Sequence, residues 1–207
     1  MIQDFIQSSF KTSAAVLTAL KYRDACTEAH CTRVATLAWQ MGANMGLVER
    51  ELGCMVSAAV LHDVGKIGIP DHILLHTGPL NQQEIEVIRG HSEIGEQIVG
   101  QLDIPTASEV AVLVRWHHER LDGQGYPDGL KGSEVPLMAR IISAADAYDA
   151  LTSERTYRNS WANQTAIDEL TREQETRFGS NVISALRDVL KGRKLETIIG
   201  SEPLACR

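Results

Sequence analysis

Apolar residues recur at helical spacing along most of this chain, and strict alternation of apolar and polar residues over a strand's length is hard to find. The segment 49–63 illustrates the pattern, because Met55, Val56 and Ala59 lie three, four and seven residues after Leu52. Only 5% of the residues are aromatic, so we expect a core of Ala, Leu, Ile and Val, as in packed helices. The sequence therefore predicts an all-α fold.

Capping signals help to delimit the expected helices. Gly46 suits the C-cap of a long helix that follows Thr27, and Asn81 with Glu84 resembles a capping box at a helix start. The predicted helical segments are 12–22, 28–45, 49–63, 81–88, 92–102, 107–118, 137–152, 162–176 and 181–192.

Two long connections interrupt these helices. Residues 64–80 and 119–136 are rich in Gly and Pro, and each follows a helix end that carries histidine. Loops of this length are uncommon in a compact domain and often carry function. We therefore expect the chemistry of the protein to lie where these loops begin.

Composition limits the classes of function. The 207 residues fit one domain with small extensions, and the formal net charge of -7 argues against a general binder of DNA or RNA polymers. No apolar run approaches the ~18 residues that span a bilayer, and the first ten residues lack the features of a signal peptide. The four cysteines form no CxxC pair, so we expect reduced thiols and a cytoplasmic protein.

Two adjacent pairs carry the strongest chemical signal among the seven histidines. His62 is followed by Asp63, and His117 by His118. Imidazole nitrogens with a carboxylate suit zinc, iron, manganese or nickel, and a carboxylate can bridge two cations through its two oxygens. A single histidine is more often a surface or core residue, and a bare His-Asp dipeptide is a weak signal. The pairs gain weight from the Gly-rich loops that follow them.

Longer motifs carry a family resemblance. HDVGKIGIPDHILLHTGPL from His62, GHSEIGEQI around His91, HHERLDGQGYPDGLKG from His117 and RIISAADAYDALTSERTYR from Arg140 occur in this order. The stretch from about Asp24 to Arg158 resembles the HD-GYP branch of the HD superfamily of metal-dependent phosphohydrolases. The resemblance implies an HD-type helical bundle whose long loops cover a metal site. It implies a catalytic domain at 23–193, after a helical extension or linker at 1–22 and before a tail at 194–207.

The resemblance also implies the metal ligands. Residues at one metal would be His30, His62, Asp63 and Asp146, and residues at the second would be His91, His117 and His118, with Asp63 bridging. Iron and manganese are preferred, and nickel and zinc remain open. Some family members hold a third metal with a glutamate four residues before the first histidine. Cys26 stands there in this chain, so we expect two metals. His72 and His76 match no ligand position.

The implied activity is hydrolysis of cyclic di-GMP to linear pGpG, with further hydrolysis to GMP left open, by attack of a hydroxide that bridges the metals. Asp63 and Lys66 would act at the reacting phosphate. Tyr126, Arg155 and Arg158 would contact the substrate, and Gly125 and Pro127 would fix the turn that presents the tyrosine. An upstream sensory or receiver domain and a homodimer are further expectations. The alternatives are an HD phosphohydrolase for another cyclic dinucleotide or nucleotide, and a non-catalytic binding module for signalling.

Overall fold

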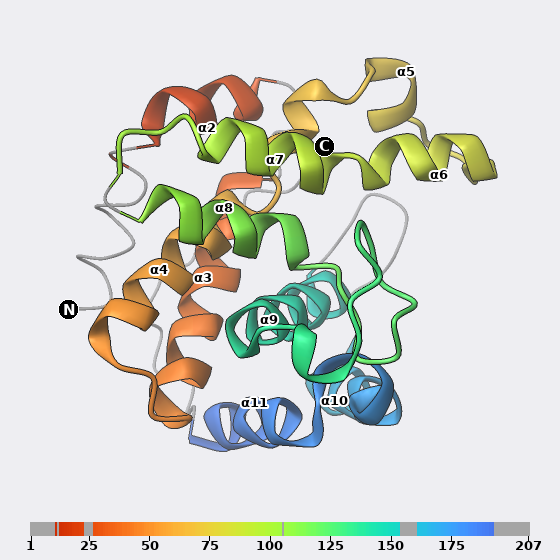
Figure 1. Ribbon diagram of the computed structural model, residues 1–207. Helices are drawn as coiled ribbons and strands as arrows, with labels where there is room; N and C mark the ends of the chain where they lie inside the picture. Colours follow the sequence, from red (N-terminus) through yellow and green to blue (C-terminus); the bar gives the residue numbers. More distant parts are fainter. Residues whose placement is uncertain (1–10, 12, 23–26, 105, 154–160, 193–207) are drawn as a thin grey trace.

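The protein is predominantly helical in the part that the computed structural model describes, residues 11, 13–22, 27–104, 106–153 and 161–192 (Figure 1). These residues contain no β-strand, and one isolated bridge joins Asp122 to Lys131 within the long loop. The prediction of an all-α fold is confirmed. The longer helices are α2 (Ala14–Lys21), α3 (Thr27–Asn44), α4 (Glu49–Leu61), α6 (Gln82–Arg89), α7 (His91–Val99), α8 (Ala107–Trp116), α9 (Leu137–Thr152), α10 (Asn163–Arg172) and α11 (Ser180–Gly192).

The core forms around α3, which packs against α4, α9 and α11, while α8 packs against both α4 and α7. Its apolar side chains are almost completely removed from solvent, and each of the larger ones contributes roughly 1.5–3 kcal/mol through burial. Small residues allow close helix approach: a Cβ on Gly42 of α3 would lie 2.6 Å from Cε of Met55 in α4. Typical core residues are Val34, Met41, Met55, Ile142 and Leu186.

Several predicted boundaries hold. Asn81 Oδ1 accepts a hydrogen bond from the Glu84 backbone N–H at 3.0 Å, and Glu84 Oε2 accepts from the Asn81 N–H at 2.8 Å, which confirms the capping box. Gly46 follows α3 with a φ of 80°, a left-handed conformation that glycine adopts without strain.

Other boundaries differ from the prediction. The expected loop 64–80 contains a 3-10 helix, η1 (Val64–Gly68), and the short α5 (Asp71–Leu74), and the loop 119–136 contains the 3-10 turn η2 (Gly132–Glu134). The helix expected over 162–176 stops at Arg172 and is followed by the π-turn η3 (Gln174–Phe178). The buried side chain of Phe178 and the φ of 93° at Gly179 mark the end of this turn. Sequence periodicity does not register such single-turn elements.

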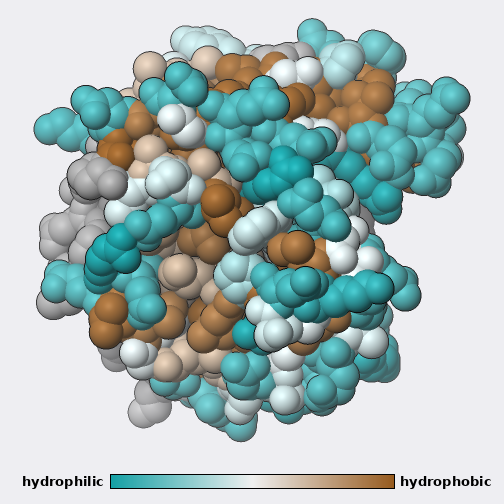
Figure 2. Space-filling model, viewed as in Figure 1, coloured by the Kyte–Doolittle hydropathy of each residue, from teal (hydrophilic) through white to brown (hydrophobic). Residues whose placement is uncertain are grey.

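The N-terminal segment contacts the rest of the protein. In α2, Leu20 is buried, and the helix packs against η1 and α3. The domain boundary at residue 22 remains a prediction. Within the described residues, none of the helices has both the length and the apolar character needed to cross a membrane. On the face shown in Figure 2, hydrophilic residues predominate and hydrophobic ones form small separate groups.

Candidate metal centre

Side chains from five helices converge where the ends of α4 and α8 and the start of α7 meet the first turn of α3 and the middle of α9. The helix ends contribute most of them, because His62 directly follows α4, His117 directly follows α8, and His91 begins α7. All seven predicted ligands lie in this region. Six of them form two groups of three, and the seventh lies between the groups. The seven are His30, His62, Asp63, His91, His117, His118 and Asp146.

The first group consists of His30, His62 and Asp146. His30 Nε2 lies 3.2 Å from Asp146 Oδ1 and 3.3 Å from His62 Nε2, and His62 Nε2 lies 3.9 Å from the same Asp146 oxygen. The three candidate ligand atoms all lie within 4.8 Å of one another. Two imidazoles and a carboxylate at this separation can hold a transition-metal ion.

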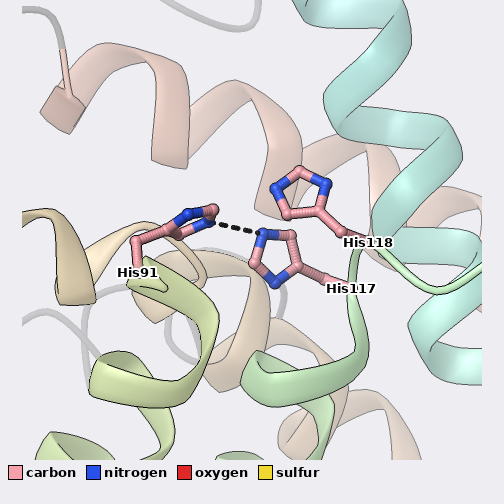
Figure 3. A group of neighbouring side chains, drawn as sticks. All are labelled: His91, His117 and His118. Atoms are coloured by element: carbon pink, nitrogen blue, oxygen red, sulfur yellow. Dashed lines mark hydrogen bonds between the residues drawn. The ribbon is translucent and has the colours of Figure 1, made fainter. Parts of the chain in front are cut away.

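The second group consists of His91, His117 and His118 (Figure 3). The Nε2 atoms of His91 and His117 are 3.4 Å apart, and the dashed line in Figure 3 joins these two rings. The ring of His118 lies beside that of His117, with the centroids 3.9 Å apart. His91 comes from α7 and the other two from the end of α8, so the packing of these two helices assembles the group.

Asp63 lies between the groups and faces both. Its Oδ2 is 3.4 Å from His62 Nε2 and 3.9 Å from His30 Nε2, whereas its Oδ1 is 3.7 Å from His91 Nε2. One carboxylate oxygen is thus directed to each group, which is the arrangement that a bridging ligand needs.

Backbone carbonyls fix the tautomer of three histidines. His62, His91 and His117 each donate an Nδ1–H to the carbonyl three residues earlier, at 2.8, 2.7 and 2.6 Å respectively. These carbonyls belong to the last turns of α4, α6 and α8, where helices leave backbone oxygens without partners. Because a carbonyl only accepts, Nδ1 must carry the proton, and each neutral ring directs an Nε2 lone pair into the centre.

This donor set fits a cation. With both Nδ1 atoms protonated, the neutral rings of His91 and His117 cannot form an N–H···N bond across their 3.4 Å contact, and their lone pairs face each other. A metal ion bound by both nitrogens would remove that repulsion. The surrounding hydrogen bonds have the form in which metal-binding histidines are usually held.

His30 differs from the other histidines in the partner of its Nδ1. Nδ1 lies 2.7 Å from Oδ2 of Asp149. The same carboxylate accepts two further hydrogen bonds. Arg33 Nε donates to its Oδ1 at 2.6 Å, and Ser153 Oγ donates to its Oδ2 at 3.2 Å. Asp149 lies three residues after Asp146 on α9 and therefore on the same side of the helix. The first group thus includes a ligand held by a carboxylate, whereas His91 and His117 of the second group are held by backbone carbonyls.

Burial and charge act differently on the ionisable groups. Burial lowers the pKa of His91 and of His118, and it lowers that of His117 to about 3, so these rings stay neutral. Burial also opposes the charge of His30, but its hydrogen bonds to Asp146 and Asp149 raise its pKa to about 9. Burial would raise the pKa of Asp63, yet the neighbouring Lys66 and His62 hold it well below its usual range.

Lys66 lies one turn after Asp63, as predicted, although on the 3-10 helix η1 rather than on an α-helix. Its Nζ is 2.7 Å from Asp63 Oδ2, because residues three apart lie directly above each other on a 3-10 helix. The ammonium group is therefore in direct contact with the carboxylate that joins the two groups.

Tyr126 lies against the second group. Its ring stacks on that of His118, with centroids 4.7 Å apart and an interplanar angle of 28°, and the guanidinium carbon of Arg89 lies 5.2 Å from its centroid. Gly125 is required by close approach, because a Cβ there would come within 2.5 Å of Glu119 Cα and of the Arg120 nitrogen. The peptide bond between Tyr126 and Pro127 is cis.

Glu119, which is not among the predicted site residues, anchors the loop that carries Tyr126. The side chain is buried, and its oxygens accept hydrogen bonds from the backbone N–H groups of Asp128, Gly129 and Leu130 at 2.7, 3.1 and 2.9 Å. The Asp128 carboxylate in turn accepts two hydrogen bonds from Arg115, both at 2.7 Å. A glutamate directly after the histidine pair gives no sequence signal of this role.

Some predicted residues lie elsewhere. Arg155, Arg158 and Cys26 fall outside the described residues, so their predicted roles stay predictions. His72 and His76 are exposed and belong to neither group, in line with the expectation that they are not ligands. His72 lies on α5 rather than in a loop.

A family model named HD domain matches residues 13–182, which is most of the chain. The chain belongs to the HD-domain family. The Gly125-Tyr126-Pro127 triplet and the relatives place it in the HD-GYP branch. The chain is 38% identical over 191 residues to the cyclic di-GMP phosphodiesterase response regulator RpfG of Xanthomonas campestris, covering 92% of this chain and 50% of that protein.

Two further relatives carry related names. A cyclic di-GMP phosphodiesterase of Thermotoga maritima is 38% identical over 165 residues, covering 80% of this chain and 45% of the relative. The 3'3'-cGAMP-specific phosphodiesterase 2 of Vibrio cholerae is 33% identical over 189 residues, covering 90% and 36%. The HD-domain chain thus spans half or less of the length of each of these relatives.

Solved structures share the fold. An HDG"Y"P protein of Bdellovibrio bacteriovorus, Bd1817, superposes with a TM-score of 0.65 at 19% identity, covering 93% of this chain and 65% of that one. The HD domain of the phosphodiesterase PgpH of L. monocytogenes gives a TM-score of 0.61 at 17% identity, covering 86% and 95%. The HD-type helical bundle predicted from the sequence is thereby confirmed.

Proposed function

We propose that this HD-GYP chain is a metal-dependent phosphodiesterase that opens cyclic di-GMP to linear pGpG. The observation that carries the proposal is the pair of histidine-rich groups with one oxygen of Asp63 directed to each. Curated relatives named as cyclic di-GMP phosphodiesterases support the choice of substrate.

Each group would hold one divalent cation. We propose two metals, with iron or manganese preferred, because imidazole and carboxylate ligands accept both. Cations in such a site lower the pKa of water and neutralise the charge of a phosphodiester. The ligands would be His30, His62 and Asp146 at the first group, His91, His117 and His118 at the second, and Asp63 at both.

The residues around the groups would position the substrate. Lys66 places an ammonium group beside Asp63, where it would attract the phosphate and offset negative charge that develops during attack. Tyr126 presents a ring and a hydroxyl next to His118. Arg155 and Arg158 are proposed to bind guanine or phosphate, since a guanidinium can donate two parallel hydrogen bonds to either.

A second cyclic dinucleotide is the main competing substrate. Several Vibrio cholerae relatives are named as specific for 3'3'-cGAMP, with identities of 33% and 34% for two of them. We also propose a cytoplasmic location, where the thiols of Cys31 and Cys54, which form no disulfide, would stay reduced. An upstream sensory or receiver domain and a homodimer are part of the same proposal.

Parallel hydrolysis assays test the function. Protein purified without air would be analysed for metal and then incubated with cyclic di-GMP, 3'3'-cGAMP and cyclic di-AMP at one metal concentration. We expect the highest kcat/KM for cyclic di-GMP, with pGpG as the first product. A higher kcat/KM for 3'3'-cGAMP would transfer the assignment to that substrate. A metal-loaded protein that binds these nucleotides but cleaves none would instead be a binding module.

A further inference from the structure

Arg89 is fixed relative to a candidate metal ligand only two residues away. It is the last residue of α6, and Gly90 joins it to His91 at the start of α7. The carbonyl of Arg89 accepts a hydrogen bond from Ser92 Oγ at 3.1 Å, and the carbonyl of Ile88 accepts one from His91 Nδ1 at 2.7 Å. Because Ser92 and His91 are both buried, this turn cannot shift without moving the second metal group.

The side chain of Arg89 extends from this turn over Tyr126. Its guanidinium carbon is 5.2 Å from the centroid of the Tyr126 ring, and that ring stacks on His118 with centroids 4.7 Å apart. The cation therefore lies one aromatic ring away from the second metal group. Burial raises the pKa of the Tyr126 phenol, whereas the positive charges of Arg89 and of Arg177 in η3 act in the opposite direction.

The charge of Arg89 is available to a ligand. It forms an ion pair from Nη1 to Glu86 Oε1 at 2.8 Å, one turn earlier on α6, and these side chains are 42% and 55% exposed. An exposed pair of this kind contributes little to stability, so a phosphate could replace it at small cost. A guanidinium offers five N–H donors in a planar fork that matches the oxygens of a phosphate.

We propose that Arg89 binds the second phosphate of the cyclic dinucleotide, the one that is not cleaved. The inference rests on the proposed function, in which the reacting phosphate lies at the two metal groups. A cyclic dinucleotide has two phosphates separated by its nucleosides, so the second must lie away from the metals. Since the protein has a formal net charge of -7, that phosphate needs a local cation. Arg89 supplies one beyond the Tyr126 ring.

Kinetics with two classes of substrate test this role. Arg89→Ala and Arg89→Lys would be compared with wild type on cyclic di-GMP and on bis(p-nitrophenyl) phosphate, which has one phosphate. Arg172→Ala is the matched control, because Arg172 forms the same kind of exposed pair with Glu169 at the end of α10. We expect Arg89→Ala to raise KM for cyclic di-GMP about ten- to hundredfold, with kcat nearly unchanged. Lysine should restore part of the loss, because it keeps the charge but not the fork.

For bis(p-nitrophenyl) phosphate, Arg89→Ala should change kcat and KM by less than about twofold each. The metal content of the variant should stay at the wild-type value. The inference is overturned if Arg89→Ala matches Arg172→Ala on cyclic di-GMP. It is also overturned if the variant loses metal, or if it impairs the ester as severely as the dinucleotide. A wild-type protein that cleaves the ester but no cyclic dinucleotide would overturn the proposed function and this inference with it.

Discussion

Histidine orientation at the metal centre depends on where helices end. The carbonyls that accept from His62, His91 and His117 lie in the last turns of α4, α6 and α8, where a helix leaves backbone oxygens available. One hydrogen bond therefore satisfies the backbone and directs Nε2 toward the site. His30 lies in the first turn of α3, away from any helix C-terminus, and uses the carboxylate of Asp149 instead.

Asp149→Asn tests the importance of that carboxylate. Asparagine keeps the size of the side chain but removes the charge that holds both His30 and Arg33. Outer partners of metal ligands typically account for 10–100-fold in affinity, so we expect a loss of that size for one of two bound metals. Competition with a chromophoric chelator would measure it. Asp168→Asn on the exposed face of α10 is the control, and equal affinities in the two variants would contradict the expectation.

Asp63→Ala should have a larger effect, because one oxygen of Asp63 faces each group. We expect both metals to be lost at moderate metal concentration and hydrolysis to be abolished. The fold should survive, since helix packing supplies most of the stability. Metal analysis would measure the bound metal and circular dichroism the helical fold, with Asp188→Ala on α11 as the control. Near-normal turnover at saturating metal would refute the bridging role.

At the scale of elements, the loop from Glu119 to Val135 is held by hydrogen bonds between its first side chain and its own backbone. Glu119 accepts three backbone N–H groups within 128–130, which folds the segment around Tyr126. Glu119→Gln replaces one acceptor oxygen with an NH₂ group that faces a donor, at a cost of about 1–3 kcal/mol. We expect faster hydrogen exchange at residues 128–130 and a lower kcat/KM for the cyclic dinucleotide.

The control for this variant lies on the same loop. Glu134 also accepts from a backbone N–H, that of Lys131 at 2.8 Å, but its side chain is exposed. Glu134→Gln should leave both the hydrogen exchange at residues 128–130 and the kcat/KM for the cyclic dinucleotide close to the wild-type values. If the two variants behave alike, the buried carboxylate is not what positions Tyr126.

The elements also show how far sequence reasoning reaches. Long helices such as α4 and α9 are predictable because the apolar periodicity repeats over several turns. The seven candidate ligands are predictable because several motifs occur along the chain in the order that is typical of one family. The sequence did not reveal the roles of Asp149 and Glu119, because local patterns do not record the contacts that create these roles. Asp149 contacts His30, which is 119 residues away in the sequence, and Glu119 accepts from backbone groups up to 11 residues away. Spacing from Asp146 was the one available hint for Asp149.

At the scale of the whole molecule, the core and the metal centre are separable. The large buried side chains, among them Met41, Ile142, Phe178 and Leu186, belong to an apolar cluster that needs no metal for its packing. Several of the helices that bear the ligands, including α3, α4 and α9, are also the ones that build this cluster. Metal binding should therefore add to stability that already exists, as any ligand specific for the folded state does.

Metal removal tests this separation. A ligand at about 100 times its dissociation constant stabilises the folded state by about 2.7 kcal/mol, and for a protein of this size each kcal/mol raises the unfolding temperature by about 2–4 °C. We therefore expect chelation to lower the unfolding temperature by roughly 5 to 11 °C while the helical circular dichroism at 25 °C is retained. The temperature should rise again as metal is added back. Asp63→Ala should show little of this metal dependence, because Asp63 faces both groups. A chelated wild-type protein that has lost its helices would show instead that the metals are required for folding.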